Sequence, residues 1–155
     1  MVMDWTKHWE KNYGNFFWRA WVLAITRAYK KLLKNINLND AKILELGSGS
    51  GKNSSTIAKI LKTKRITLVD FNEKALEISK ELIGNSNSDL DVKYLKRNIL
   101  DLNLNEKFDI VHSEGLVEHF YGKSRVEVFK KHVDFCKRDG VIIIFVPYKS
   151  LRKAI

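Results

Sequence analysis

The chain has 155 residues, of which 45% are hydrophobic and 30% charged, and this composition fits one globular domain with a short extension rather than a disordered chain. We expect no membrane-spanning helix, secretory leader, internal disulfide or cysteine-based zinc site, because no long apolar run or signal-peptide pattern is present and Cys136 is the only cysteine. These features predict a cytoplasmic protein. The net charge of +10 leaves two interpretations open: an ordinary basic surface, which we favour, or a site for an anionic partner.

Residues 1–38 are predicted to form an aromatic, amphipathic helical arm. All four tryptophans lie in the first 21 residues, and apolar residues then recur at spacings of three and four, which predicts a helix over residues 16–35. Its inward face is predicted to hold Trp18, Trp21, Ile25, Ala28 or Tyr29, Leu32 and Ile36. This arm either covers a sheet, which we favour, forms a lid over an acceptor pocket, or lies on a membrane surface.

Residues 39–155 are predicted to form one α/β domain. Strands are predicted at 42–46, 65–69, 91–95, 108–112 and 141–146, with helices at 54–61, 73–83 and 124–136 and a polar loop at 84–88. In the last helix, Val126, Phe129, Val133 and Phe135 are expected to face inward, and the last strand is apolar on both faces, as suits a covered strand. The alternation predicts a three-layer, doubly wound, mainly parallel sheet with ligands at the carboxyl ends of its strands.

A glycine-rich turn follows the first predicted strand, from Gly47 to Gly51, and such turns serve three kinds of site. A P-loop would need a hydroxyl residue where Asn53 stands and a glycine where Leu46 stands. A dinucleotide-binding fingerprint would need its third glycine where Lys52 stands. The third interpretation is a methyl-donor site, and we favour it over the dinucleotide site because of a family resemblance.

Glu45 and the alternating glycines after it resemble the first motif of the class I S-adenosylmethionine-dependent methyltransferases, of the small-molecule methyltransferase-domain type. Four further segments resemble this family in the same order, at residues 66–72, 96–102, 108–119 and 139–144. The resemblance covers residues 35–148. It implies a Rossmann-like methyltransferase fold of about five strands here, with S-adenosylmethionine as the cofactor and S-adenosylhomocysteine as the product.

The resemblance also implies the residues of the site. The expected cofactor-binding residues are Glu45, Gly47, Ser48, Gly49, Gly51, Asp70, Phe71, Asn98, Ile99, Ser113 and Glu114. Glu45 would contact the amino group of the donor, Asp70 the ribose hydroxyls, and Asn98, where the family commonly has aspartate, the adenine. His119 is either a general base or a structural polar residue, and no metal is expected.

The family sheet has seven strands in the order 3-2-1-4-5-7-6, and no residues are left here for the last two. We therefore expect a C-terminally truncated domain whose fifth strand has an unpaired edge, which a second copy or a completing partner chain would cover. The predicted function is methyl transfer to a small-molecule acceptor; the alternative is a non-catalytic or incomplete subunit that binds the donor and needs a partner. Nucleic acid is not favoured, because no Asn/Asp-Pro-Pro-aromatic tetrad follows the fourth strand, and neither is a membrane surface.

Overall fold

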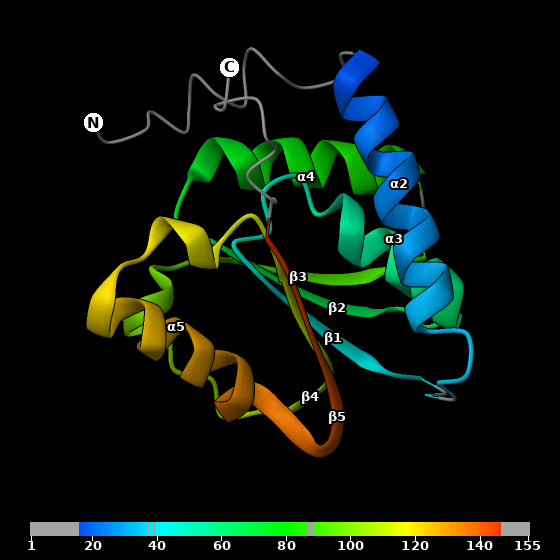
Figure 1. Cartoon of the computed structure of the whole chain (residues 1–155). Helices are drawn as coiled ribbons and strands as arrows, with labels where there is room; N and C mark the ends of the chain where they lie inside the picture. The colour runs from blue at the N-terminus through cyan, green and yellow to red at the C-terminus, as the bar shows by residue number, and fades with distance from the viewer. Residues whose placement is uncertain (1–15, 37, 39, 87–88, 147–155) are drawn as a thin grey trace, which may run out of the picture.

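The computed structural model describes residues 16–36, 38, 40–86 and 89–146 (Figure 1). Its elements, in chain order, are α2 (Phe16–Leu32), β1 (Lys42–Leu46), α3 (Lys52–Leu61), β2 (Arg65–Asp70), α4 (Glu73–Ser86), β3 (Asp91–Lys96), η1 (Ile99–Asp101), β4 (Phe108–Glu114), η2 (Val117–His119), α5 (Gly122–Phe135) and β5 (Cys136–Phe145).

The five strands form one parallel sheet in the order β3-β2-β1-β4-β5. Strand β1 lies at the centre, where Ile43 is in register with Ile66 of β2 and with Ile110 of β4. Parallel neighbours require crossover connections, and helices α3, α4 and α5 supply them. The predicted doubly wound parallel sheet is therefore confirmed.

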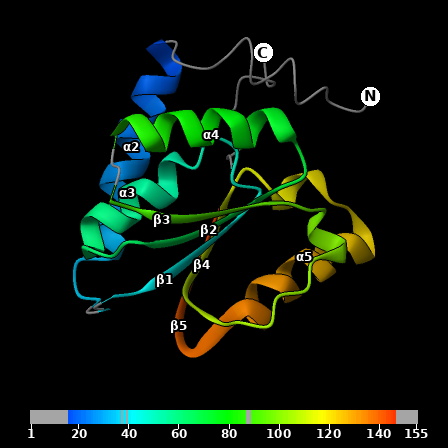
Figure 2. The same cartoon turned by 180° about the vertical axis from the view of Figure 1, so that it is seen from behind.

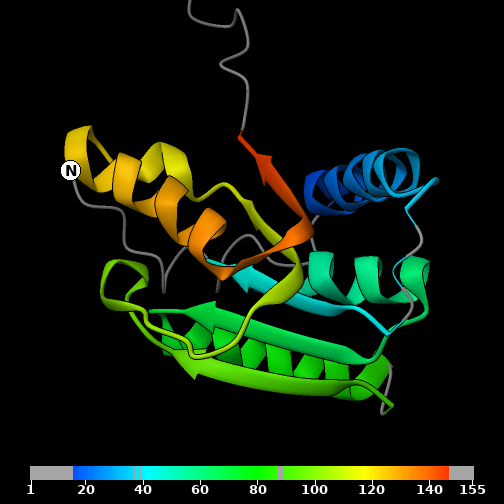
Figure 3. The ribbon, with the colours of Figure 1, turned by 90° about the horizontal axis from the view of Figure 1, so that it is seen from below.

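Helices cover both faces of the sheet (Figures 2 and 3). Helices α2, α3 and α4 pack on one face over a buried cluster that includes Ile43, Ile57 and Leu68. Helix α5, with η1 and η2, packs on the other face over a second cluster that includes Leu44 and Val111. Within the described ranges, no helix has the length and apolar character needed to cross a membrane.

Helix α2 covers the sheet, which is the interpretation that the sequence favours for this segment. Among the described side chains, Ile25 and Tyr29 of α2 and Leu33, just after its end, are buried, each four residues from the next. The prediction that Leu32 faces inward is wrong, because Leu32 is 52% exposed and Leu33 takes the inward place. Residues three or four apart lie on the same face of a helix, so both Leu32 and Leu33 fit the spacing, and the face that packs on the sheet is the one that carries Tyr29. The side chains of all four tryptophans lie outside the described part of the chain.

Helix α5 presents a different face to the sheet from the one predicted. Its buried residues are Val128, His132 and Phe135, so the prediction for Phe135 is confirmed. The prediction for Val126, Phe129 and Val133 is wrong, because these side chains are 57%, 43% and 63% exposed. The inward face can hold a histidine because both ring nitrogens of His132 are bonded, Nδ1 donating to the Val128 carbonyl (2.8 Å) and Nε2 accepting from the Ser113 hydroxyl (2.9 Å).

Strand β5 is an edge strand, and in the described residues it pairs with β4 alone. The expectation of a central strand covered on both faces is wrong in its first part, and the faces are covered only in part: Ile143 is its only buried residue, while Val141 and Phe145 pack partly buried on one face and Ile144 on the other. The expectation of an unpaired edge next to the fourth strand holds for the described residues. The strand also begins at Cys136, earlier than predicted, and an irregularity opposite Phe108–Ile110 separates its start from its apolar part.

Helix α4 begins as predicted and ends later. The Asn72 side-chain oxygen accepts a hydrogen bond from the Ala75 amide (3.1 Å), which caps the helix. The helix then continues to Ser86, through Gly84, where the sequence predicts a loop.

Candidate functional site

The glycine-rich turn between β1 and α3 is anchored on the end of the neighbouring strand β2. The amides of Gly47 and Ser48 both donate to the Val69 carbonyl, at 2.9 and 3.0 Å. The three glycines of the turn, Gly47, Gly49 and Gly51, all have positive φ angles. Side-chain-bearing residues rarely adopt this backbone, so the turn depends on glycine.

Gly51 also permits close packing between two helices. It precedes the first turn of α3 with φ near +65°, and a Cβ atom there would lie 2.5 Å from Ser79 Oγ and 2.7 Å from Leu68 Cδ1. The start of α3 thus lies directly against α4 and the sheet. This contact fixes where the turn presents its amides.

Asp70 ends β2 and is held by the turn beside it. Its Oδ2 accepts from the Gly49 amide and its Oδ1 from the Asn72 amide, each at 2.8 Å. The side chain is buried, and this burial raises the pKa of Asp70 although the backbone hydrogen bonds act against the shift. Each carboxylate oxygen retains capacity to accept a further hydrogen bond.

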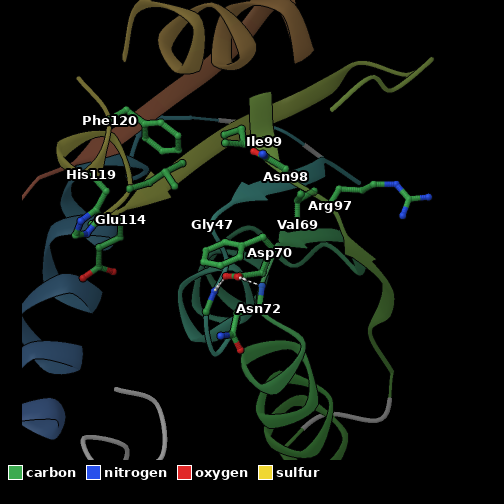
Figure 4. A pocket seen from close by; sticks show the side chains of 14 residues that line it. Gly47, Val69, Asp70, Asn72, Arg97, Asn98, Ile99, Glu114, His119 and Phe120 are labelled. Carbon is green, nitrogen blue, oxygen red and sulfur yellow. Dashed lines mark hydrogen bonds between the residues drawn. The ribbon is translucent and has the colours of Figure 1, made fainter. Parts of the chain in front are cut away.

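A cavity of about 280 Å³ lies at the carboxyl ends of the strands (Figure 4). Its lining comprises Gly47, Gly49, Val69, Asp70, Phe71, Asn72, Arg97, Asn98, Ile99, Glu114, Gly115, Leu116, His119 and Phe120. Eight of the residues singled out from the sequence are among them: Gly47, Gly49, Asp70, Phe71, Asn98, Ile99, Glu114 and His119. The segments that follow β1, β2, β3 and β4 therefore meet at one site.

Four predicted residues lie outside this lining. Glu45 is almost fully buried beneath it, where its Oε2 accepts from the Ser54 hydroxyl (2.8 Å), and burial raises its pKa to about 8. The Ser113 side chain is buried against His132, Ser48 is buried within the turn, and Gly51 lies where α3 begins. These four residues lie behind the lining of the cavity and pack against the elements that form it.

One rim of the cavity suits a flat aromatic ligand. Phe71 is 57% exposed there and lines the cavity, so its ring offers an apolar surface on which a flat ring can stack. The Asn98 side-chain oxygen accepts from the Leu100 amide (3.0 Å), so Asn98 also caps the short helix η1. Ile99, the first residue of η1, is buried.

The opposite wall comes from the end of β4 and from η2. It carries Glu114, whose Oε2 accepts a hydrogen bond from the Asn53 side chain, and the exposed His119 (Figure 4). A carboxylate and an imidazole on one wall could bind a cation and exchange a proton. No group of three His, Cys, Asp or Glu side chains suited to a metal ion occurs in the described ranges.

Sequence reasoning missed several lining residues. Gly115, Leu116 and Phe120 follow β4 directly, and Asn72 and Arg97 follow Asp70 and β3. Gly115 has a positive φ of 64°, so its glycine identity could have marked the turn. The other signal available was position, since residues just beyond the carboxyl ends of neighbouring parallel strands meet at one edge.

Comparison with known proteins identifies relatives of this chain. The family described as "Methyltransferase domain" matches residues 43–140. The chain is 31% identical over 119 residues to the ribosomal protein L11 methyltransferase of Thermosipho africanus, covering 77% of this chain and 42% of that protein. It is 35% identical over 86 residues to the release factor glutamine methyltransferase of Flavobacterium psychrophilum, covering 54% of this chain and 29% of that protein. The chain thus spans less than half the length of these relatives.

Solved structures share the fold. One is coclaurine N-methyltransferase bound to N-methylheliamine and S-adenosylhomocysteine, with a TM-score of 0.67 and 21% identity over 79% of this chain and 35% of that one. The family match, the sheet order and the position of the cavity agree with one another. The chain belongs to the class I S-adenosylmethionine-dependent methyltransferases.

Proposed function

We propose that the cavity binds S-adenosylmethionine and that the protein transfers the donor's methyl group to an acceptor. The observation that carries this proposal is Asp70, whose carboxylate is fixed by the Gly49 and Asn72 amides while it faces the cavity. A preorganised acceptor of this kind at the end of the second strand suits the two hydroxyls of a ribose.

The remaining lining residues fit the other parts of the donor. Phe71 and Ile99 offer apolar surface to an adenine ring, and the Asn98 amide offers a polar group beside it. On the opposite wall, Glu114 would bind the donor's ammonium, and the turn at Gly47 and Gly49 lets backbone approach its carboxylate closely. In this arrangement Glu45 supports Glu114 from behind instead of touching the donor.

The bound donor would supply a methyl group on a sulfonium, which is already a good leaving group. The protein's contribution is then mainly to position the acceptor and exclude water. His119 is exposed on the wall beside Glu114 and would take the proton that an amine or hydroxyl acceptor loses. We expect His119→Ala to slow methyl transfer and to leave S-adenosylhomocysteine binding nearly unchanged.

Calorimetric titration with S-adenosylhomocysteine tests the donor site. Asp70→Ala should weaken binding by about 1.5–3 kcal/mol, the contribution of hydrogen bonds to a charged acceptor. Asp101→Ala is the matched control, because Asp101 is exposed in η1 near the site and does not line the cavity. Absence of binding heat for the unaltered protein with either S-adenosylhomocysteine or S-adenosylmethionine would overturn the proposal.

We propose a small-molecule acceptor, and a protein acceptor is the second candidate. The second is favoured by the names of the two curated relatives, which refer to ribosomal protein L11 and to a release factor. Methyl-labelled S-adenosylmethionine, offered with a panel of small amines in one series and with ribosomal protein L11 or a release factor in another, distinguishes the two. We also propose a cytoplasmic location, which suits either acceptor.

The alternative of a subunit completed by a second chain has its own support. The apolar stripe of α5, formed by Val126, Phe129 and Val133, is exposed, and β5 offers an edge that pairs with no other described strand. We propose that a second copy or a completing partner covers this region. Donor binding without methyl transfer by the isolated chain would favour this alternative.

A further inference from the structure

A chain of hydrogen bonds runs through the interior from α2 to the carboxylate beneath the cavity. The Tyr29 hydroxyl lies 3.3 Å from His112 Nδ1, and His112 Nε2 lies 2.8 Å from Ser54 Oγ. Ser54 Oγ in turn lies 2.8 Å from Glu45 Oε2. The four residues come from α2, β4, α3 and β1, so the chain connects both helices to the two central strands.

The direction of the hydrogen bonds along this chain follows from the bond between Ser54 and Glu45. Ser54 Oγ donates its single proton to Glu45 Oε2, which also faces the Ser54 amide and accepts whether or not Oε1 is protonated, so the Ser54 oxygen must accept from His112 Nε2–H. His112 Nδ1 then carries no proton and accepts from the Tyr29 hydroxyl. Tyr29 therefore selects the His112 tautomer that leaves the Ser54 proton for Glu45.

Because these groups are buried, the direction of the hydrogen bonds affects the stability of the protein. Tyr29, His112 and Ser54 are fully buried, and Glu45 is 1% exposed. Burial lowers the pKa of His112 to about 3, with His132 on the other face of the sheet adding to the shift, so His112 is neutral and its tautomer is defined by its partners. In such surroundings an unmatched donor or acceptor is costly, so the loss of one link should rearrange the next.

The chain continues to the cavity wall through an amide. The Asn53 side chain lies beside Glu45, whose pKa it lowers, and donates to Glu114 Oε2, and Glu114 lines the cavity. The charged and titratable groups around Glu45 are Glu114 and His112 from β4 and Tyr29 from α2, with Ser54 from α3 as its hydrogen-bonding partner. Tyr29 itself lies outside residues 43–140, which match the family.

We propose that Tyr29 is a positioning residue for the donor site: through His112, Ser54 and Glu45 it orients Asn53 and hence Glu114 on the cavity wall. The effect on donor binding rests on the proposed function, whereas the tautomer that it imposes on His112 does not. Helix α2, which precedes the family-matched segment, thereby becomes part of the donor site without touching it.

Nitrogen NMR of the histidine rings tests the first half of the proposal in the free protein. The unaltered protein should show His112 as the Nε2–H tautomer and His132, which donates from Nδ1 to the Val128 carbonyl, as the opposite one. Tyr29→Phe should move His112 toward the Nδ1–H form, with Glu45 Oε1 3.9 Å from that nitrogen, and leave His132 unchanged. Ser54→Ala should leave the His112 tautomer as it is, because Tyr29 still donates to it. A His112 tautomer that does not respond to Tyr29→Phe would overturn the proposal.

Calorimetry with S-adenosylhomocysteine tests the second half. Tyr29→Phe should raise Kd by about 3- to 10-fold, and Ser54→Ala by at least as much, on the scale of single buried hydrogen bonds. The double variant should bind about as weakly as Ser54→Ala alone, because both changes break one chain. Tyr94→Phe, on the same face of the sheet in β3, is the control and should stay within about 2-fold.

Additive effects of the two substitutions, or an unchanged Kd in Tyr29→Phe, would overturn the link to the donor site. If the unaltered protein binds no S-adenosylhomocysteine, the proposed function fails. The NMR measurement of the His112 tautomer still shows whether Tyr29 sets the direction of the hydrogen bonds. If Tyr29→Phe does not fold, Ser54→Ala still tests the link nearest Glu45 by both measurements.

Discussion

The two edge strands of the sheet differ in how they meet solvent. Strand β3 carries charged side chains along its exposed side, and Lys93 and Lys96 pair with Glu106 and Glu73. Strand β5 carries only apolar residues from Val141 to Phe145, although Ile143 alone among them is buried. Charged side chains on an edge discourage pairing with other chains, whereas a bare apolar edge invites it. The β3 edge is therefore suited to solvent and the β5 edge to a partner.

The same difference extends to the helices beside each edge. Around β1 and β2 the strands are buried almost throughout, and α3 packs tightly on α4 at Gly51. Helix α5 buries one apolar face and leaves Val126, Phe129 and Val133 exposed. Substitutions near the donor site should therefore lower the free energy of unfolding strongly. Matched substitutions of exposed residues on the β5 side should change it little.

The largest effect is expected at Gly51. Gly51→Ala should lower the free energy of unfolding by about 2–4 kcal/mol, because alanine is strained at a positive φ and its Cβ would clash with Ser79 and Leu68. Donor binding should be lost with it. Gly84→Ala is the control: a Cβ at Gly84, within α4, meets nothing within 4 Å, and alanine there should stabilise the helix by up to about 1 kcal/mol. Denaturant unfolding measures both, and equal effects would contradict the packing described.

The next effect separates the two faces of α5. Val128→Ala should cost about 2 kcal/mol in free energy of unfolding, because Val128 is fully buried and the change leaves a cavity. Val126→Ala makes the same chemical change at a side chain that is 57% exposed and should stay within about 0.5 kcal/mol. If Val126→Ala proves the costlier of the two, a partner covers that face in solution or the helix is rotated.

The turn at Gly47–Gly51 and Asp70 could be predicted because they depend on neighbours in the sequence, whereas the strand order could be expected only from the resemblance to the methyltransferase family. A strand that runs into a glycine-rich turn, or that ends in aspartate, carries its signal within a few residues. On the side of the site formed by Gly115, Leu116 and Phe120 the only such signal is the glycine at position 115, because the places of the other two residues depend on where η2 packs.

The inward face of α5 could not be predicted for a different reason. The set Val126, Phe129 and Val133 and the set Val128, His132 and Phe135 both have helical spacing, and the sequence favours the first because histidine is polar. Only the fold shows that Ser113 and a backbone carbonyl satisfy that ring. The burial of Glu45 could not be predicted either, because the sequence does not tell which side chains at strand ends reach a cavity.

A smaller effect, and one that depends on pH, is expected at Glu45. Burial holds its pKa near 8 in the folded protein, above the ordinary value of 4.5, so the folded state retains a proton that the unfolded chain loses between these values. The contribution of protonated Glu45 to the free energy of unfolding is complete below pH 4.5 and is lost as the pH rises toward 8. Glu45→Gln should therefore raise the free energy of unfolding at pH 8.5, by about 1–2 kcal/mol, and change it little at pH 5.

The same substitution should weaken S-adenosylhomocysteine binding, because the side-chain amide of Gln replaces one carboxyl oxygen with an NH₂ donor and no longer directs Ser54 and Asn53 in the same way. Denaturant unfolding at the two pH values and calorimetry measure the two effects. A Glu45→Gln variant that is less stable at pH 8.5 than the unaltered protein would show that the carboxylate is not penalised by burial.

The smallest effect on stability, and the most direct comparison of the two edges, comes from exchanging their side chains. Ile142→Lys puts a charge on β5 where the side chain is 39% exposed, and Lys93→Ile removes one from β3. Each should change the free energy of unfolding by only about 0.5 kcal/mol. Their effects on association should be opposite: sedimentation should show less self-association for Ile142→Lys and more for Lys93→Ile, because the edge charge and not the core is altered. An unaltered protein that sediments as a monomer, with slow amide exchange along β5, would mean that this edge is already protected.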